Sequence, residues 1–353
     1  MFVKNLISID LGNENIKIVV GSSKGNALKI IDYATIETPS NTYENGEITD
    51  LDKLRGVIRR KLDEMSVKQR LKAILSLDSA EVITRELELP YSKDIDLNSI
   101  VKFELEDTLP VMLDDYIVES KILETFDEGA VKKYRILAAL MPKRIGDQLH
   151  KLIMGLNLEP YVLDINSNIM SKIISAAYKV GKWNLGEFGT IAALDIGANT
   201  TSVIIFDKTI MKLSKLIELG TIDAITGISN TFGLSFQEAK EKMISDVDLN
   251  IEESGDASAN LLSDVAKDSL EKLCDQIQMI LKFYMSRETT KEFDGLLLYG
   301  GASRIKGMKK YMEDYFKIPI IEIDVKSHVS LPVKSEEIDT KLYANALGAL
   351  LGR

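Results

Sequence analysis

Two stretches of this 353-residue chain, 185 residues apart, carry the same pattern of an apolar strand, an aspartate, a glycine and a second apolar strand. They read ISIDLGNENIKIVVG and AALDIGANTTSVIIF, so Asp10 aligns with Asp195 and Gly12 with Gly197. A repeat of half the chain length is too long for a solenoid and indicates two related domains. Each domain would present one turn to a shared cleft, where ligands commonly bind.

The Asp-x-Gly turn has a chemistry suited to phosphate. Glycine lets the backbone approach a guest closely, and the N–H groups of such a turn can cradle phosphate oxygens. An aspartate just before the glycine can hold hydrated magnesium. A third stretch, GLLLYGGASRIKGM at 295–308, is an apolar strand that runs into Gly300 and Gly301, then Ser303 as an N-cap candidate. Glycines there would let the backbone lie flat against a ring or sugar.

Composition excludes several classes of protein. Hydrophobic residues make up 45% of the chain and charged residues 28%, and no apolar run approaches the roughly 20 residues that span a bilayer. The amino terminus has no apolar signal core, and Cys274 is the single cysteine, so we expect a cytoplasmic protein with a core thiol. A net charge of −10 opposes binding to nucleic acid and to anionic lipid.

Hydrophobic periodicity predicts the elements of the first half. Strands are expected at 5–11, 15–21, 27–36 and 71–77, with a helix that begins after an N-cap at Asp50. Residues 81–156 then read as strand, helix (97–108), strand, strand and a helix opened by Pro142 in its first turn. This β-α-β-β-α block is predicted to be an insertion.

The second half repeats the meander and adds helices. Ser235 and Glu238 have the spacing of a capping box and predict the start of a helix. Residues 258–286 carry an apolar stripe that predicts a long amphipathic helix.

Taken together, the three motifs resemble the actin-like ATPase superfamily. IDLGNENIK resembles its first phosphate motif, LDIGANTT its second and LLLYGGASRIKGM its adenosine motif, while YANALGALLG resembles the helix that links its domains. The place of the insertion resembles the FtsA-like branch. Four more stretches, VITRELELP, IVKFELEDTLPVMLDDYIVES, RILAALMPKRIGDQLHKLIMGLNLEPYVLDINS and FGLSFQEAKEKM, resemble the PilM family of type IV pilus assembly proteins, so that the resemblance covers nearly the whole chain.

The resemblance implies roles for individual residues. ATP and Mg²⁺ are the expected ligands, with Asp10 and Asp195 flanking the metal through water and Lys17 reaching a phosphate oxygen. The two turns would hold phosphates and the third motif would line the nucleoside. The residues concerned are Gly12, Asn13, Glu14 and Asn15, then Gly197, Ala198, Asn199 and Thr200, then Gly300, Gly301 and Ser303.

Two departures from the family pattern bear on activity. Lys240 and Met243 stand where relatives usually carry glutamate and lysine at the ribose and adenine, so we expect Lys240→Glu with Met243→Lys to tighten ATP binding. Asn166 stands where many relatives have a carboxylate or related polar group, and it cannot act as a general base. We therefore expect ATP binding with weak or absent turnover and identify no catalytic residue.

The expected organisation is an α/β actin-like fold with two related domains around a nucleotide cleft. Its limits are 1–80 and 159–188 for the first domain, 81–158 for the inserted subdomain, 189–336 for the second domain and 337–353 for the interdomain helix. The resemblance implies a scaffold of the inner-membrane pilus platform that is attached through the cytoplasmic tail of a PilN-like protein, docked between the first domain and the insertion. Alternatives are a filament-forming actin-like ATPase and a phosphotransferase of the sugar-kinase type, for which no catalytic base is evident.

Overall fold

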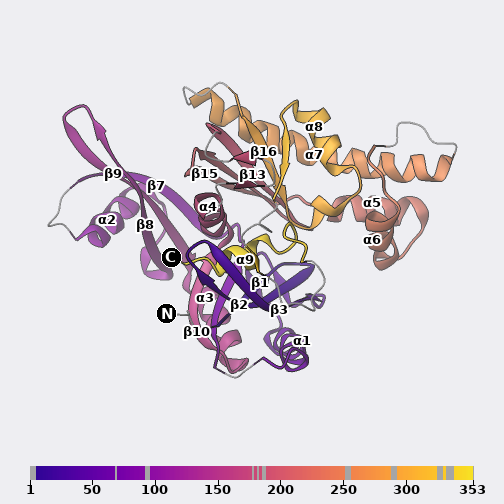
Figure 1. The fold of residues 1–353 in the computed structure, drawn as a ribbon, viewed down its shortest axis with the longest axis horizontal. Helices are drawn as coiled ribbons and strands as arrows, with labels where there is room; N and C mark the ends of the chain where they lie inside the picture. The colour runs from indigo at the N-terminus through magenta and orange to yellow at the C-terminus, as the bar shows by residue number, and fades with distance from the viewer. Residues whose placement is uncertain are drawn as a thin grey trace.

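A computed structural model describes residues 5–67, 70–91, 96–176, 179–180, 183–184, 188–250, 256–287, 292–323, 329–330 and 338–352. Two mixed sheets form the body of the molecule, and a smaller sheet projects to one side (Figure 1). Among these residues, no helix is both long enough and apolar enough to cross a membrane.

The first domain is built on a six-stranded sheet in the order β10-β6-β1-β2-β3-β18. Its strands are β1 (Leu6–Leu11), β2 (Asn15–Lys24), β3 (Ala27–Glu37), β6 (Lys72–Leu77), β10 (Glu159–Ile165) and β18 (Val329–Ser330). The predicted antiparallel meander β1-β2-β3 is confirmed, and β6 pairs in parallel with β1. A short hairpin, β4 (Tyr43–Glu44) and β5 (Glu47–Ile48), leads to helix α1 (Leu51–Glu64), whose predicted N-cap Asp50 accepts a hydrogen bond from Lys53 N.

The inserted sheet has a core of its own. It consists of β7 (Ile83–Pro90), β8 (Tyr116–Glu128) and β9 (Val131–Pro142) in the antiparallel order β7-β9-β8. Helix α2 (Leu97–Thr108), at the predicted bounds, and the 3₁₀ turn η1 (Leu113–Asp115) pack against one face of this sheet. Helix α3 (Lys143–Gly155) follows β9 but buries its apolar side against α1 and the first sheet. Pro142 ends β9 and is the N-cap of α3, one position before the predicted first turn.

The second domain repeats the hairpin and parallel strand of the first. Its sheet has the order β15-β14-β13-β16-β17, from β13 (Thr190–Ile196), β14 (Thr201–Asp207), β15 (Ile210–Ile217), β16 (Gly295–Tyr299) and β17 (Ile320–Glu322). Its helices are α5 (Ile222–Phe232), α6 (Phe236–Ser245), α7 (Ala257–Arg287) and α8 (Met308–Phe316), with the 3₁₀ turn η3 (Gly301–Arg304) after β16.

Local signals for the helices of the second domain are confirmed. The capping box of Ser235 and Glu238 is present at the start of α6. The apolar stripe of α7 is buried, and Cys274 lies within it as a core thiol, where burial raises its pKa to about 12.

Two helices fill the space between the sheets. They are α4 (Asn166–Ala176) and α9 (Ala344–Ala349), and a Cβ on Gly348 of α9 would lie 2.6 Å from Cδ1 of Ile173 in α4. The residues just before and within α9 contact both domains: Tyr343 OH lies 2.6 Å from Thr35 Oγ1 of β3, and Asn345 donates to Asp195. A small hairpin, β11 (Lys179–Val180) and β12 (Trp183–Asn184), follows α4. The domain limit expected at 336 and 337 lies outside the described residues.

Candidate functional site

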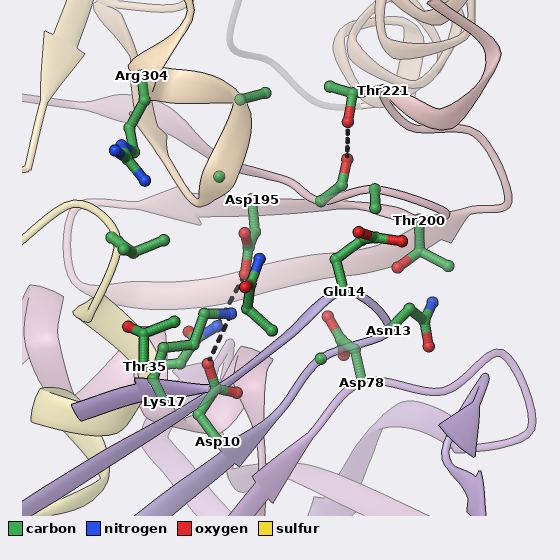
Figure 2. A pocket seen from close by; sticks show the side chains of 18 of the residues that line it. Asp10, Asn13, Glu14, Lys17, Thr35, Asp78, Asp195, Thr200, Thr221 and Arg304 are labelled. Carbon is green, nitrogen blue, oxygen red and sulfur yellow. Dashed lines mark hydrogen bonds and ion pairs between the residues drawn. The ribbon is translucent and has the colours of Figure 1, made fainter. Parts of the chain in front are cut away.

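A cleft opens between the two sheets, at the turns that the sequence duplicates, and its empty space is about 1180 Å³ when the adjoining open solvent is included. Figure 2 shows Asp10 and Asp195 on facing sides of it, with the side chain of Lys17 between them. Most of the predicted site residues line this cleft, namely Asp10, Gly12, Asn13, Glu14, Asn15, Lys17, Asp195, Gly197, Ala198, Thr200, Lys240, Met243 and Gly301. Three do not: Asn199, Gly300 and Ser303.

The two turns are built in the same way. In the first hairpin Asp10 pairs with Lys17, and in the second Asp195 pairs with Ser202. A Cβ on Gly12 would lie 2.8 Å from the carbonyl oxygen of Asn15, and a Cβ on Gly197 would lie 2.9 Å from that of Thr200. Both glycines are therefore required by the close return of the chain.

The two aspartates have different partners. Asp10 is only 3% exposed; its Oδ2 lies 3.4 Å from Lys17 Nζ, and its Oδ1 accepts from Ser76 Oγ at 3.4 Å. Asp195 accepts from Asn345 Nδ2 at 2.8 Å. Burial raises the pKa of Asp195 to about 6, while the Asn345 hydrogen bond and the nearby Lys17 charge limit the rise.

The loop after β16 exposes backbone to the cleft. Gly300 has φ +85°, and a Cβ there would collide with Asp195 Oδ1, so only glycine fits. A Cβ on Gly301, in contrast, would meet nothing within 4 Å. Ser303 is buried and donates to the Gly300 carbonyl at 2.7 Å, so it shapes the loop without lining the cleft.

The two residues at the expected ribose and adenine positions lie on α6. Lys240 Nζ forms an ion pair with Glu14 in the first turn and lies 3.0 Å from Glu37 Oε1 at the end of β3. Met243 is almost fully buried in the core of the second domain, although it also borders the cleft.

Sequence reasoning missed Asp78, which directly follows β6 at the floor of the cleft (Figure 2). It accepts a hydrogen bond from the Ser202 hydroxyl of the other domain. Burial, with Asp195 and Asp10 nearby, raises the pKa of Asp78 to about 7. A carboxylate placed directly after a mostly apolar strand was the available signal. The other unpredicted polar residues that line the cleft are Thr35, Tyr43, Ser202, Thr221, Arg304 and Asn345.

The cleft has features that suit a polar guest with a metal. Two of its lining side chains, Asn166 and Asn345, have a buried Oδ1 without a hydrogen-bond partner. Buried polar atoms are normally paired, so a polar ligand or water would fit beside them. Among the described residues, no three His, Cys, Asp or Glu side chains converge as a metal site. A cation here would need phosphate or water oxygens in addition to Asp10 and Asp195, which is the usual coordination of Mg²⁺.

Comparison with known proteins gives a family and a fold. The model of the family "Type IV pilus assembly protein PilM" matches residues 8–351. Cell division protein FtsA of Bacillus subtilis (strain 168) is 22% identical over an alignment of 266 residues that covers 66% of this chain and 56% of FtsA, so the match spans little more than half of that relative.

Solved structures show the same fold. A PilM-PilN type IV pilus biogenesis complex superposes with a TM-score of 0.80 at 19% identity, over 98% of this chain and 97% of that one. MreB 5 of Spiroplasma citri bound to AMPPNP superposes with a TM-score of 0.56 at 12% identity, over 98% of this chain and 95% of that one. The fold is therefore actin-like, as the sequence predicted.

Proposed function

The chain belongs to the PilM family of type IV pilus assembly proteins, and from this premise we propose that it is an ATP-binding scaffold that holds a PilN-like membrane protein. The family supports a role in pilus assembly. The nucleotide is inferred from the cleft and the partner from two exposed strand edges, and each inference has its own test.

The main support for nucleotide binding is that two Asp-x-Gly turns and the unobstructed backbone of Gly301 line the same cleft. Gly12 and Gly197 hold turns that can wrap phosphate oxygens, and Asp10 and Asp195 would hold a hydrated magnesium ion between them. Magnesium, when bound, would neutralise phosphate charge. Gly301 offers flat backbone to the nucleoside because nothing occupies the space above it.

Binding does not require turnover in this proposal. Asn166, which lines the cleft, carries an amide and cannot remove a proton from water. Nucleotide would act by preferring one arrangement of the two domains and so changing the affinity for the partner. Calorimetric titration with ATP, with and without Mg²⁺, tests the site directly. The proposal would be refuted if ATP gave no heat of binding and ADP did not compete with ATP for the protein.

Two exposed strand edges, one in the first domain and one in the inserted sheet, suit an extended peptide. Strand β10 is an edge of the first sheet, and its side chains Tyr161 and Leu163 are 47% and 37% exposed. Strand β8 is an edge of the inserted sheet and reaches the first domain, since Lys121 Nζ lies 3.2 Å from Asn168 Oδ1 of α4. An extended tail can pair with a strand edge and place its apolar side chains against exposed ones such as Tyr161 and Leu163.

A substitution on the exposed edge strand β10 separates peptide binding from folding. We expect Tyr161→Asp to weaken binding of a synthetic PilN-like cytoplasmic tail at least tenfold, because it puts a charge where an apolar side chain would dock. Met279→Asp is the matched control, since Met279 is 63% exposed on α7 of the second domain. Equal affinity of both variants would place the tail elsewhere.

Membrane attachment then follows from the partner. The chain carries a net charge of −10, which disfavours direct contact with anionic lipid. We propose a peripheral location at the inner face of the cytoplasmic membrane, reached through the PilN-like protein.

A further inference from the structure

One lysine joins the two domains across the mouth of the cleft. Lys240 lies on α6 of the second domain, and both of its carboxylate partners, Glu14 and Glu37, belong to the first domain. The partners are far from Lys240 in sequence, with Glu37 separated from it by 203 positions. The contact is therefore tertiary and exists only while the domains stand close together.

This ion-pair cluster is better shielded than an ordinary surface pair. The side chains of Lys240 and Glu14 are 16% and 25% exposed, whereas that of Glu37 is 63% exposed. Burial alone would lower the pKa of Lys240, but its hydrogen bonds to the two glutamates outweigh burial and raise it. Lys240 stays charged, and the Glu14 pair is the less screened of the two.

The helix that presents Lys240 is fixed in place. The Ser235 capping box sets its start, and Ala239 and Met243 anchor it in the core of the second domain. Lys240 cannot follow the first domain if the cleft opens, because its backbone is held. Opening must therefore break both ion pairs. The Asp78–Ser202 hydrogen bond is a second link, at the floor of the cleft.

We propose that Lys240 is a clasp that keeps the two domains closed without any ligand and thereby sets how fast a bound nucleotide leaves. The second half of this statement rests on the proposed ATP site. Glu14 sits in the same turn as Gly12, so its carboxylate would repel phosphate groups held there unless Lys240 neutralises it. Lys240 thus neutralises the Glu14 charge in the phosphate turn and also stabilises the closed arrangement of the two domains.

The test compares two lysines of the same helix. Lys240→Met removes the cross-cleft charge, and Lys242→Met removes a lysine whose partner, Asp246, belongs to the end of the same helix. On ligand-free protein, small-angle X-ray scattering and hydrogen exchange should show a larger radius of gyration and faster exchange in the β1-β2 turn for Lys240→Met only. Raising the salt concentration should expand the wild type towards this variant and leave the variant unchanged.

A second measurement addresses the nucleotide. Release of a fluorescent ATP analogue in stopped-flow should be roughly five- to tenfold faster in Lys240→Met, the range for two ion pairs of partial exposure, and unchanged in Lys242→Met. Pairing Lys240→Glu with Glu14→Lys should restore the compact state that Lys240→Glu alone loses, because the better-shielded ion pair is then rebuilt with reversed charges.

The outcomes separate the clasp from the proposed function. Identical scattering and exchange of ligand-free Lys240→Met and wild type would overturn the clasp, even if both bind ATP. Expansion of Lys240→Met together with a wild type that binds no ATP would support the clasp and refute the nucleotide site.

Discussion

Substitution of Gly301 by valine tests whether the cleft holds a nucleoside at the loop after β16. A Cβ at Gly301 meets no atom within 4 Å, and Gly301 is not among the residues with positive φ. Valine there should therefore cost the fold little. Its two methyl groups would point into the open cleft, where a bound ring would otherwise touch the backbone.

The size of the effect follows from forced overpacking. A ring held against Gly301 would have to move away or push the loop, and adding carbons to a filled space typically costs about 1–3 kcal/mol. This corresponds to roughly five- to more than a hundredfold weaker binding. The neighbouring glycine gives a matched control. Gly300→Ala puts a Cβ onto Asp195 at φ +85°, so it should lower stability by about 1–2 kcal/mol or more through strain alone.

Two measurements on each variant complete the test. Thermal melting should leave Gly301→Val near the wild-type Tm and lower the Tm of Gly300→Ala by several degrees. Calorimetry with ATP and Mg²⁺ should show the weakened binding for Gly301→Val. A folded Gly301→Val protein with wild-type affinity would show that the nucleoside does not lie on this loop, and the adenosine motif would be misassigned.

Three further outcomes are expected. Asp10→Ala and Asp195→Ala should each weaken ATP binding in Mg²⁺ but much less in EDTA; equal affinity in Mg²⁺ would refute their role at the metal. Burial raises the pKa of Asp78 in the folded state to about 7, from 3.8 for a free carboxyl, so the folded state keeps a proton which the unfolded chain releases, and the unfolding free energy should fall as pH rises from about 4 to 7. Urea unfolding should show this slope, worth about 1–3 kcal/mol after solvent screening, and Asp78→Asn should flatten it. The isolated protein should not float with anionic liposomes unless they carry the membrane partner.

Helix limits were the part of the fold most open to sequence reasoning, because local signals decide them. Asp50 and Ser235 cap α1 and α6 as predicted, and α2 has the predicted bounds. The stripe predicted at 258–286 became α7, one residue longer at each end. These signals act over one or two helical turns, so their physical cause is visible in a short window.

Ion pairs between side chains on opposite sides of the cleft could not be predicted from local sequence patterns. Lys240 was expected beside the ribose, but the structure pairs it with Glu14 and Glu37, which no local pattern connects to it. The gain predicted for Lys240→Glu with Met243→Lys stays a prediction, and these contacts argue against it, since the first substitution would bring three carboxylates together. Met243 fills the core, so Met243→Lys would bury a charge there.

The duplication itself indicates which way round a nucleotide would lie. Ser76 pairs with Asp10 as Tyr299 pairs with Asp195, so Asp78 and Gly301 occupy equivalent places two residues further on. Asp78 accepts a hydrogen bond from Ser202, and Ser202 is the equivalent in the second domain of Lys17 in the first. If the second domain repeated this contact, the side chain of residue 301 would bond to Lys17. Residue 301 is a glycine, so it has no side chain that could form this contact. One side of the cleft is therefore closed by a cross-domain hydrogen bond and the other is left open, and we infer that the nucleoside enters over Gly301 while the phosphates meet both turns.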